Sequence, residues 1–398
     1  MASQKKQTEV LKNLYNDSMD HIEKATFSFP VLKIVVLSVL FGFAAGMVGG
    51  LIVNTYFISR KDMDLPQYFT VKEERTKEKK KEKTPNRQLI ETLIPSVVSI
   101  YEKKVPGGSI ESQFYLPQDL KGGGVILTND GWIITSELLI EGGSKEYVVV
   151  THEKKVYPVL KVILDSACQI AFLKIEAENL LAVNLGENEN LDFNEAVLAM
   201  SSGGTMVATN IENLSYQKAE KFSDLIISSE KFYKFILIKN NLPLFFQGSP
   251  LFDLKGSLQG IILSPSNEDE EVRLVMPLDY FKTSITSVLK YGTLKRPTLG
   301  VNYIDLAGPL TQAQGEVGQE GSMGALVYGM NKIPAVLPKS PAQKNGIKKG
   351  DIILEVEGVE VNHKNSLTEF VQEYRAGDKI KLLILRDGEE LQTLVELE

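Results

Sequence analysis

The chain has 398 residues, of which 43% are hydrophobic and 24% are charged, so it is long enough for two or three domains that each bury a core. Its formal net charge of −7 gives no reason to expect a nucleic acid partner. The single cysteine, Cys168, excludes an intrachain disulfide and a multi-cysteine metal site. A zinc or histidine-based site would have to draw on His21, His152 and His363 alone, and we expect neither a metal nor a cofactor.

An apolar run at residues 31–57 follows a polar N-terminal tail at residues 1–30. Lys33 is its only charged residue, and about 20 apolar residues suffice for a helix that spans a bilayer. We predict an uncleaved transmembrane signal anchor. The alternative is a cleaved signal peptide, whose apolar region is usually about 7–15 residues long and therefore shorter than this run. Basic residues flank the run on both sides, so the charge count does not favour either orientation.

Residues 58–89 are dense in charges of both signs, which indicates a solvated linker. Between residues 90 and 292 the sequence consists of short runs rich in β-branched residues, which are separated by turns such as Asn129-Asp130-Gly131. Many short strands at this spacing predict one all-β barrel or a pair of barrels. The runs lie at Ser96–Tyr101, Gly124–Thr128, Trp132–Thr135, Tyr147–Thr151, Val156–Leu164, Ile170–Ile175, Ala196–Met200, Leu225–Ser228, Phe235–Ile238 and Gly260–Leu263.

A helix is predicted at Pro277–Tyr291, where the β-rich region closes. Residues 293–398 then alternate strands with a helix at about Ser366–Tyr374. In that segment Leu367, Phe370, Val371 and Tyr374 repeat with helical spacing, so one face of the helix is apolar.

Three segments in the β-rich region resemble the HtrA/DegS family of trypsin-like serine proteases, and they occur in the family's order. They are GGGVILTNDGWIITSEL at 122–138, DSACQIAFLKI at 165–175 and FFQGSPL at 245–251. The resemblance implies a mainly β fold. In it a trypsin-like double β-barrel is followed by a C-terminal α+β PDZ domain and preceded by one transmembrane helix.

The departures from the family pattern fall on the residues that carry its chemistry. The resemblance aligns the general base histidine with Leu138, the orienting aspartate with Gln169 and the nucleophilic serine with Gln247. Leucine cannot accept a proton, a neutral amide cannot stabilise an imidazolium, and an amide is no nucleophile. Phe245 and Phe246 replace the family's glycine and asparagine in the oxyanion loop. We therefore predict no catalytic residue at these positions.

Other residues offer weak substitutes for the lost triad. Ser249 lies two residues beyond the nucleophile position, and His152 is either a solvated turn residue or a relocated base. Cys168 adjoins the aspartate position and is either a small packed side chain or a nucleophile. An active centre would need a paired nucleophile and base, which none of these supplies in the sequence.

The C-terminal part resembles the PDZ domain that follows HtrA protease domains, most specifically through SPAQKNGIKKGDIIL at 340–354. The resemblance implies that the loop Thr298-Leu299-Gly300-Val301 offers backbone N–H groups to a peptide's terminal carboxylate, and that the peptide adds as a strand. Leu367 and Val371 suit either the groove wall or the domain core.

These features predict a membrane-anchored, catalytically inactive protease homologue that acts as a scaffold or regulator in envelope protein quality control. The resemblance implies an extracytoplasmic body, peptide binding at the PDZ groove, and a homotrimer or a mixed trimer with an active relative. The alternatives are an active serine endopeptidase with an unrecognised centre and a purely structural tether.

Overall fold

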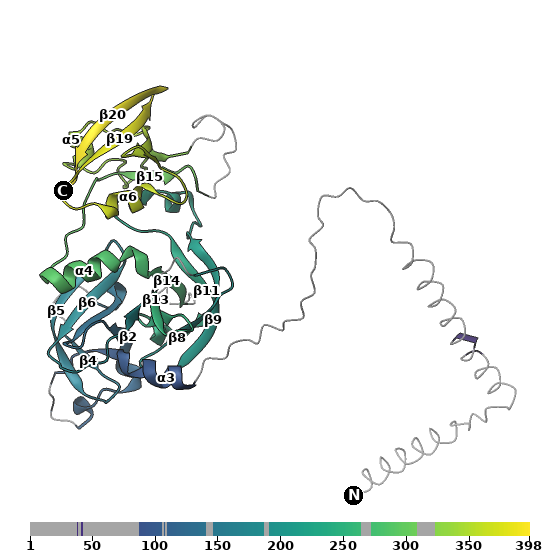
Figure 1. Cartoon of the computed structure of the whole chain (residues 1–398), viewed down its shortest axis with the longest axis vertical. Helices are drawn as coiled ribbons and strands as arrows, with labels where there is room; N and C mark the ends of the chain where they lie inside the picture. Colours follow the sequence, from purple (N-terminus) through teal and green to yellow (C-terminus); the bar gives the residue numbers. More distant parts are fainter. Residues whose placement is uncertain are drawn as a thin grey trace, which may run out of the picture. The chain divides into compact units, whose positions relative to one another are not determined.

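The computed structural model describes residues 87–105, 107, 110–140, 146–186, 191–263, 272–308 and 323–398, together with Ser38, Phe41 and Gly42 (Figure 1). The chain divides into residues 1–81 and 82–398, and the fold below is that of the second unit. No helix within the described residues is long and apolar enough to cross a membrane. The predicted anchor at 31–57, apart from Ser38, Phe41 and Gly42, lies outside those residues.

The first six strands close into a barrel in the order β1-β2-β3-β6-β5-β4. A short helix, α3 (Arg87–Leu93), precedes it. The core of this first barrel is a set of fully buried aliphatic residues that includes Ile100, Ile126, Ile133 and Leu173. The bounds are β1 (Val97–Glu102), β2 (Leu120–Ile126), β3 (Trp132–Ser136), β4 (Tyr147–Val150), β5 (Val156–Asp165) and β6 (Ile170–Ile175).

A second barrel follows, in which β12-β8-β9-β11-β14-β13 are neighbours and the pairing of β12 with β13 closes the ring. The short strand β7 (Asn184–Leu185) adds to β13 in parallel. Two six-stranded barrels in sequence are the double barrel that the resemblance implies. The strands are β8 (Ala196–Met200), β9 (Met206–Tyr216), β11 (Phe235–Leu242), β12 (Pro250–Phe252), β13 (Ser257–Ile262) and β14 (Val272–Pro277).

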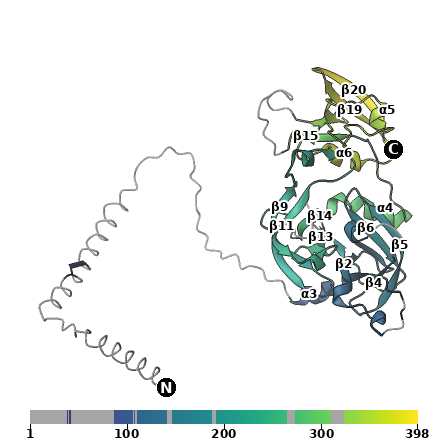
Figure 2. The same ribbon diagram turned by 180° about the vertical axis from the view of Figure 1, so that it is seen from behind.

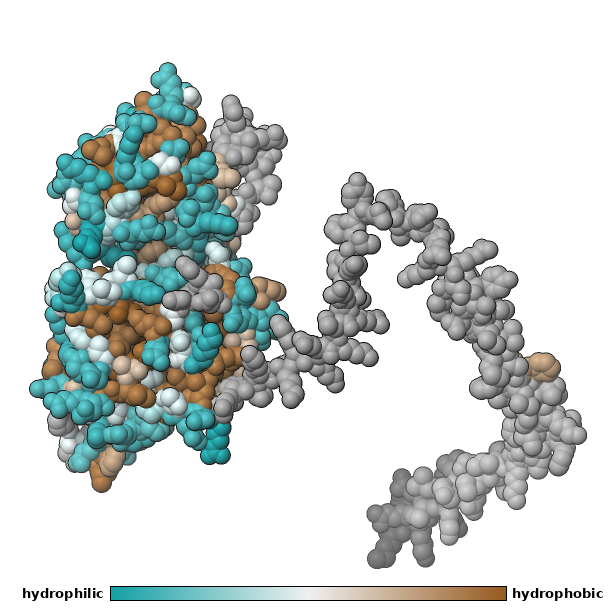
Figure 3. Space-filling model, in the orientation of Figure 1, coloured by the Kyte–Doolittle hydropathy of each residue, from teal (hydrophilic) through white to brown (hydrophobic). Residues whose placement is uncertain are grey.

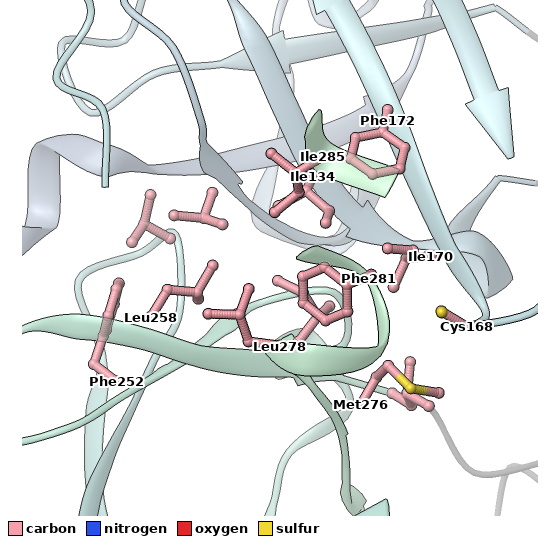
Figure 4. Close-up of a cluster of buried hydrophobic side chains, with 14 of the residues drawn as sticks. Ile134, Cys168, Ile170, Phe172, Phe252, Leu258, Met276, Leu278, Phe281 and Ile285 are labelled. Atoms are coloured by element: carbon pink, nitrogen blue, oxygen red, sulfur yellow. The ribbon is translucent and has the colours of Figure 1, made fainter. Parts of the chain in front are cut away.

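One apolar cluster joins the two barrels and a helix. It contains Ile134 and Phe172 from the first barrel, Phe252 from the second, and Phe281 and Ile285 from the helical segment (Figure 4). The predicted helix at Pro277–Tyr291 is a 3-10 turn, η9 (Leu278–Tyr280), followed by α4 (Lys282–Tyr291). Helix α4 ends at Gly292, which has the left-handed φ of +65° that favours glycine at a helix C-terminus.

The C-terminal domain is a sheet in the order β10-β15-β16-β17-β19-β20, with β18 paired to β17 and with two short helices. Helix α6 begins after Ser366, whose side chain accepts the Glu369 N–H while Glu369 accepts the Ser366 N–H, so the predicted helix has a capping box. The elements are β15 (Asn302–Asp305), β16 (Ala325–Val327), α5 (Pro341–Lys344), β17 (Ile352–Val356), β18 (Val359–Glu360), α6 (Leu367–Glu373), β19 (Lys379–Arg386) and β20 (Glu389–Glu396).

Strand β10 (Ile227–Ser228) belongs to the connection between β9 and β11 of the second barrel, yet it pairs with β15 of the C-terminal domain. In both ribbon views the teal chain of this connection reaches the C-terminal domain beside α6 and β15 (Figures 1 and 2). The predicted strand at Leu225–Ser228 therefore exists but is shorter, and it belongs to a different sheet from the one that we expected.

Candidate functional site

Hydrogen bonds to backbone carbonyls bring the three positions that align with the family's triad to one region between the barrels. The Thr135 hydroxyl donates to the Gly123 carbonyl at 2.6 Å, and the Gly123 N–H donates to the Gln247 carbonyl at 2.7 Å. The Glu137 N–H donates to the Gln169 carbonyl at 2.9 Å. The segments that carry Leu138, Gln169 and Gln247 are thus connected through hydrogen bonds to backbone carbonyls.

The side chains at these three positions cannot perform proton transfer. Leu138 lies in the 3-10 turn η5 (Glu137–Leu139) and is 48% exposed, while Gln169 and Gln247 are half-buried. Of the histidines in the described residues, His152 lies on the exposed β4–β5 turn and His363 lies in the C-terminal domain. Neither belongs to the segments around the three aligned positions, so among the described residues no histidine supplies an imidazole base there.

The segment that aligns with the family's oxyanion loop forms a 3-10 turn, η8 (Leu244–Phe246). The Gln247 N–H donates to the Leu244 carbonyl at 2.9 Å, and the Phe246 N–H donates to the Pro243 carbonyl at 2.9 Å. Phe246 is fully buried in the second barrel and its ring packs 5.1 Å from that of Phe245. An oxyanion hole needs the N–H at the nucleophile position to be free for substrate. Here that donor is used inside the turn.

Ser249 lies in a closed environment. Its hydroxyl is buried and has no hydrogen-bond partner among the described residues. A Cβ at Gly123 would lie 2.2 Å from the Ser249 hydroxyl, and a Cβ at Gly248, where φ is +75°, would lie 2.2 Å from the Thr135 hydroxyl. The strands therefore close over Ser249 and leave no room for a substrate carbonyl beside it.

A buried ion pair lies beside Cys168. The Arg296 guanidinium donates to both carboxylate oxygens of Asp165, at 3.1 and 2.7 Å, and the Ser284 hydroxyl donates to the same carboxylate at 2.6 Å. Burial raises the pKa of the Cys168 thiol well above its usual value, and the thiol donates to the Tyr280 carbonyl at 3.0 Å. A protonated, enclosed thiol is a packing residue and not a nucleophile.

The predicted PDZ groove residues do come together. Leu299, Val301, Leu367 and Val371 are all fully buried in one cluster. Gly300 has φ of +85°, and a Cβ there would lie 2.2 Å from the Cβ of Ser340, so only glycine fits at this position of the loop.

Thr298 is half-buried, and its N–H donates to the Glu398 carbonyl at 2.8 Å. It therefore stands at the edge of the loop, and its N–H is already engaged by the end of the chain.

Sequence reasoning missed the polar residues of α6 that face this groove. The Thr368 hydroxyl donates to the Ser228 carbonyl at 2.9 Å, and the Gln372 side-chain amide donates to the Ser229 carbonyl at 3.3 Å. The helical spacing marked only the apolar positions of α6. Polar residues between them carried no signal that they would bind a strand from another part of the chain.

Family models match both halves of this unit. A trypsin-like peptidase domain model matches residues 122–261, and a PDZ domain model matches residues 297–397. A probable periplasmic serine endoprotease, DegP-like, from Marinomonas sp. (strain MWYL1) is 30% identical over 280 residues, which is 70% of this chain and 56% of the relative. The chain is similar to HtrA-type serine proteases, and it carries a trypsin-like peptidase domain followed by a PDZ domain.

Other relatives agree with this assignment. The periplasmic serine endoprotease DegP of Escherichia coli (strain K12) is 25% identical to this chain over 285 residues, 70% of this chain and 56% of DegP. The chain thus spans little more than half the length of these curated relatives. The HtrA-type protease AlgW with a decapeptide superposes with a TM-score of 0.58 at 20% identity, covering 78% of this chain and 97% of AlgW, which supports the fold.

Proposed function

We propose that this HtrA-type homologue is a catalytically inactive pseudoprotease. Its barrels serve as a scaffold or regulator, and its PDZ domain binds C-terminal or unfolded peptide segments in envelope protein quality control. The observation that carries the proposal is the joint loss of all three triad side chains, at Leu138, Gln169 and Gln247, around an oxyanion loop whose Gln247 N–H is bound to Leu244.

The size of the loss supports this proposal. Removing the nucleophile or the base from a comparable protease lowers kcat by about 10⁶-fold. What remains, about 10³–10⁴-fold over water, comes from the oxyanion hole and substrate binding. In this chain the N–H of Gln247 is hydrogen-bonded to Leu244, so the share of the residual rate enhancement that an oxyanion hole would supply is lost as well.

A fluorophosphonate probe tests the inactivity. We expect no labelling of the full-length chain under conditions in which E. coli DegP is labelled to completion. Labelling of a serine that disappears on Ser249→Ala, or on mutation of another serine, would establish an active centre and disprove the proposal.

We extend the proposal to location and anchoring. The matched relatives are named as periplasmic proteases, which supports an extracytoplasmic body for this homologue, held by a single-pass membrane segment at residues 31–57. Alkaline carbonate extraction should leave the full chain in the membrane pellet. Protease added to spheroplasts should digest residues 90–398. Release by carbonate would disprove the anchor.

Trimeric assembly, either as a homotrimer or with an active relative, is the remaining part of the proposal. Phe114 is 58% exposed, and the outward face of β5 carries exposed Val156, Leu160, Val162 and Leu164. Figure 3 shows hydrophobic surface over the barrel part of the chain. Light scattering on the detergent-solubilised chain, and co-purification from the native membrane, distinguish a homotrimer, a mixed trimer and a monomer.

A further inference from the structure

The amides of the PDZ carboxylate loop are already occupied by another part of the same chain. One oxygen of the Glu230 carboxylate, Oε1, accepts the Leu299 N–H at 3.0 Å and the Gly300 N–H at 2.8 Å. The Ser229 hydroxyl accepts the next N–H, that of Val301, at 3.1 Å. Three consecutive N–H groups that a terminal carboxylate would need are therefore satisfied internally.

The residues before Glu230 also lie as an added strand. Ile227 is opposite Tyr303 and Ser228 is opposite Asn302 in an antiparallel pair at the edge of the sheet. The Ser229 N–H donates to the Val301 carbonyl at 3.0 Å. Strand addition at a sheet edge, combined with a carboxylate in a nest of backbone N–H groups, is the arrangement by which a peptide is captured.

Helix α6, on the other side of the groove, also contacts residues 227–229. Thr368 and Gln372 of α6 donate to the carbonyls of Ser228 and Ser229. Ile227 is only 7% exposed and belongs to the same apolar cluster as Leu367 and Val371. The segment thus has an apolar side chain in the groove, a paired backbone and a carboxylate at the loop.

We infer that residues 227–230, the internal ligand, occupy the PDZ groove in place of a peptide, and that a peptide with a free C-terminal carboxylate binds by displacing them. The inference rests on the proposed peptide binding and adds a condition to it. Glu230 supplies from its side chain the carboxylate that an external ligand supplies from its chain end.

The contacts on either side of the internal ligand show what must move. Strand β10 is two residues long, and Glu230 also lines a cavity of about 300 Å³ beside Arg296, Pro297 and Thr298. Beyond it, the buried Lys234 ammonium lies 3.1 Å from the Glu369 carboxylate and donates to the His363 carbonyl at 2.6 Å. Displacement of 227–230 therefore leaves the chain anchored at Lys234 while the loop amides become free.

The internal ligand belongs to the same chain as the groove, and this covalent connection determines how strongly it competes with an external peptide. A segment of the same chain acts at an effective concentration that reaches the millimolar range for short connections. The apparent affinity for an external peptide falls by the fraction of molecules with an open groove. Hydrogen bonds to a charged acceptor are the stronger kind, so removing the Glu230 charge should raise that fraction.

The test uses the full-length chain and Glu230→Gln, with Glu220→Gln as the matched control because that carboxylate, on the same connection, is 67% exposed. The probe is a fluorescein-labelled peptide with the sequence of residues 222–229, FSDLIISS, ending in a free carboxylate. The same peptide with a C-terminal amide is the control ligand. Fluorescence anisotropy gives Kd, and hydrogen–deuterium exchange follows the amides of residues 299–301. Glu230→Ala is a second variant that removes the acceptor altogether.

We expect Glu230→Gln to bind the free-carboxylate peptide at least about tenfold more tightly than the natural chain and Glu220→Gln. We expect no such gain for the amidated peptide, and faster exchange at residues 299–301 in both Glu230 variants. Equal affinity in all proteins would overturn the internal ligand while leaving peptide binding intact. Unchanged exchange in Glu230→Ala would overturn it too. Faster exchange without any peptide binding would instead refute the proposed peptide binding, and the competition with it.

Discussion

Among single residues, the Asp165–Arg296 pair is a buried polar contact beside Cys168 on which stability should depend. The Asp165 side chain is fully buried, and Arg296 pairs with it in a two-point contact. We expect Arg296→Met to lower the free energy of unfolding by about 3–5 kcal/mol, because it leaves a buried carboxylate without its partner. Urea denaturation followed by far-UV circular dichroism measures this.

The matched control is Arg87→Met. The Arg87–Glu91 pair is 91% and 62% exposed on its two side chains, and exposed pairs contribute little. A loss in Arg296→Met no larger than in Arg87→Met would show that the buried pair is not needed for stability.

Cys168 reports on the same buried region. It is the only cysteine in the chain, and burial raises the pKa of its thiol. We expect iodoacetamide at pH 7.5 to label the native chain far more slowly than the urea-unfolded chain, by mass spectrometry. Arg296→Met should not speed labelling of the native chain, because the guanidinium 2.9 Å from the sulfur favours the thiolate and its removal raises the pKa of the thiol further.

The raised pKa of the Cys168 thiol also determines how the free energy of unfolding changes with pH. The unfolded thiol loses its proton near pH 8.5, whereas the folded thiol keeps it to a higher pH. Its contribution to stability is therefore fully present below about pH 8.5 and falls as the pH rises above that value. Cys168→Ala should show a smaller decline in unfolding free energy between pH 8 and pH 10, and an unchanged decline would contradict this account.

Sequence reasoning at this scale reached the residues that belong to a linear motif and missed those that do not. Leu138, Gln169 and Gln247 were identifiable because flanking residues such as Gly248 and Pro250 fix their alignment. Glu230 is one acidic residue in a polar connection, and its role depends on a backbone loop about 70 positions further along the chain. No local pattern encodes such a contact.

At the scale of elements, strands with dense β-branched runs were predictable, and β9 was not. Its sequence, MVATNIENLSY, is rich in polar residues, and within it only Thr209 and Ile211 are buried. Backbone pairing with β8 and β11 holds it in place. Strand propensity reflects how a side chain fits a half-buried surface, so a strand held by its neighbours on both sides can lack that signal.

The proposed inactivity rests on the 3-10 turn η8 as well as on the side chains at the triad positions. We expect Leu138→His, Gln169→Asp and Gln247→Ser together to leave the chain unlabelled by a fluorophosphonate. The restored serine would still have its N–H directed to the Leu244 carbonyl. Asp is tolerated at position 169, where φ is +55°, so the triple variant is compatible with the backbone there.

Adding Phe245→Gly to the triple variant is the informative comparison. Phe245 is 39% exposed, so its loss should spare the fold, and glycine permits the loop to leave the 3-10 conformation. An oxyanion donor contributes about 10²–10³-fold to kcat, and labelling should increase by that order. If the triple variant is labelled as fast as the fourfold variant, η8 does not limit the chemistry.

At the scale of the whole molecule, the motifs predicted the order of the parts, whereas the contacts between the barrels and the C-terminal domain emerged only from the structure. Besides the internal ligand, the Tyr280 hydroxyl donates to the Glu369 carboxylate at 2.7 Å, and the Tyr233 hydroxyl donates to the Asp305 carboxylate at 3.0 Å. These pairs join residues 72 or more positions apart in the sequence. Such long-range pairing holds the groove of the C-terminal domain beside the barrels. Occupancy of the groove should therefore depend on the contacts between the barrels and the C-terminal domain.

Lys234 is the residue on which this docking should depend most. Its side chain is 5% exposed, and that of its partner Glu369 is 19% exposed. We expect Lys234→Met to lower the unfolding midpoint in differential scanning calorimetry and to split one transition into two. The reason is that Glu369 would keep its burial and lose its cation. Lys379→Met is the control, since the Lys379–Glu396 pair is 60% and 62% exposed. A single transition at the natural midpoint in Lys234→Met would mean that the added strand β10, rather than the ion pair, holds the barrels and the PDZ domain together.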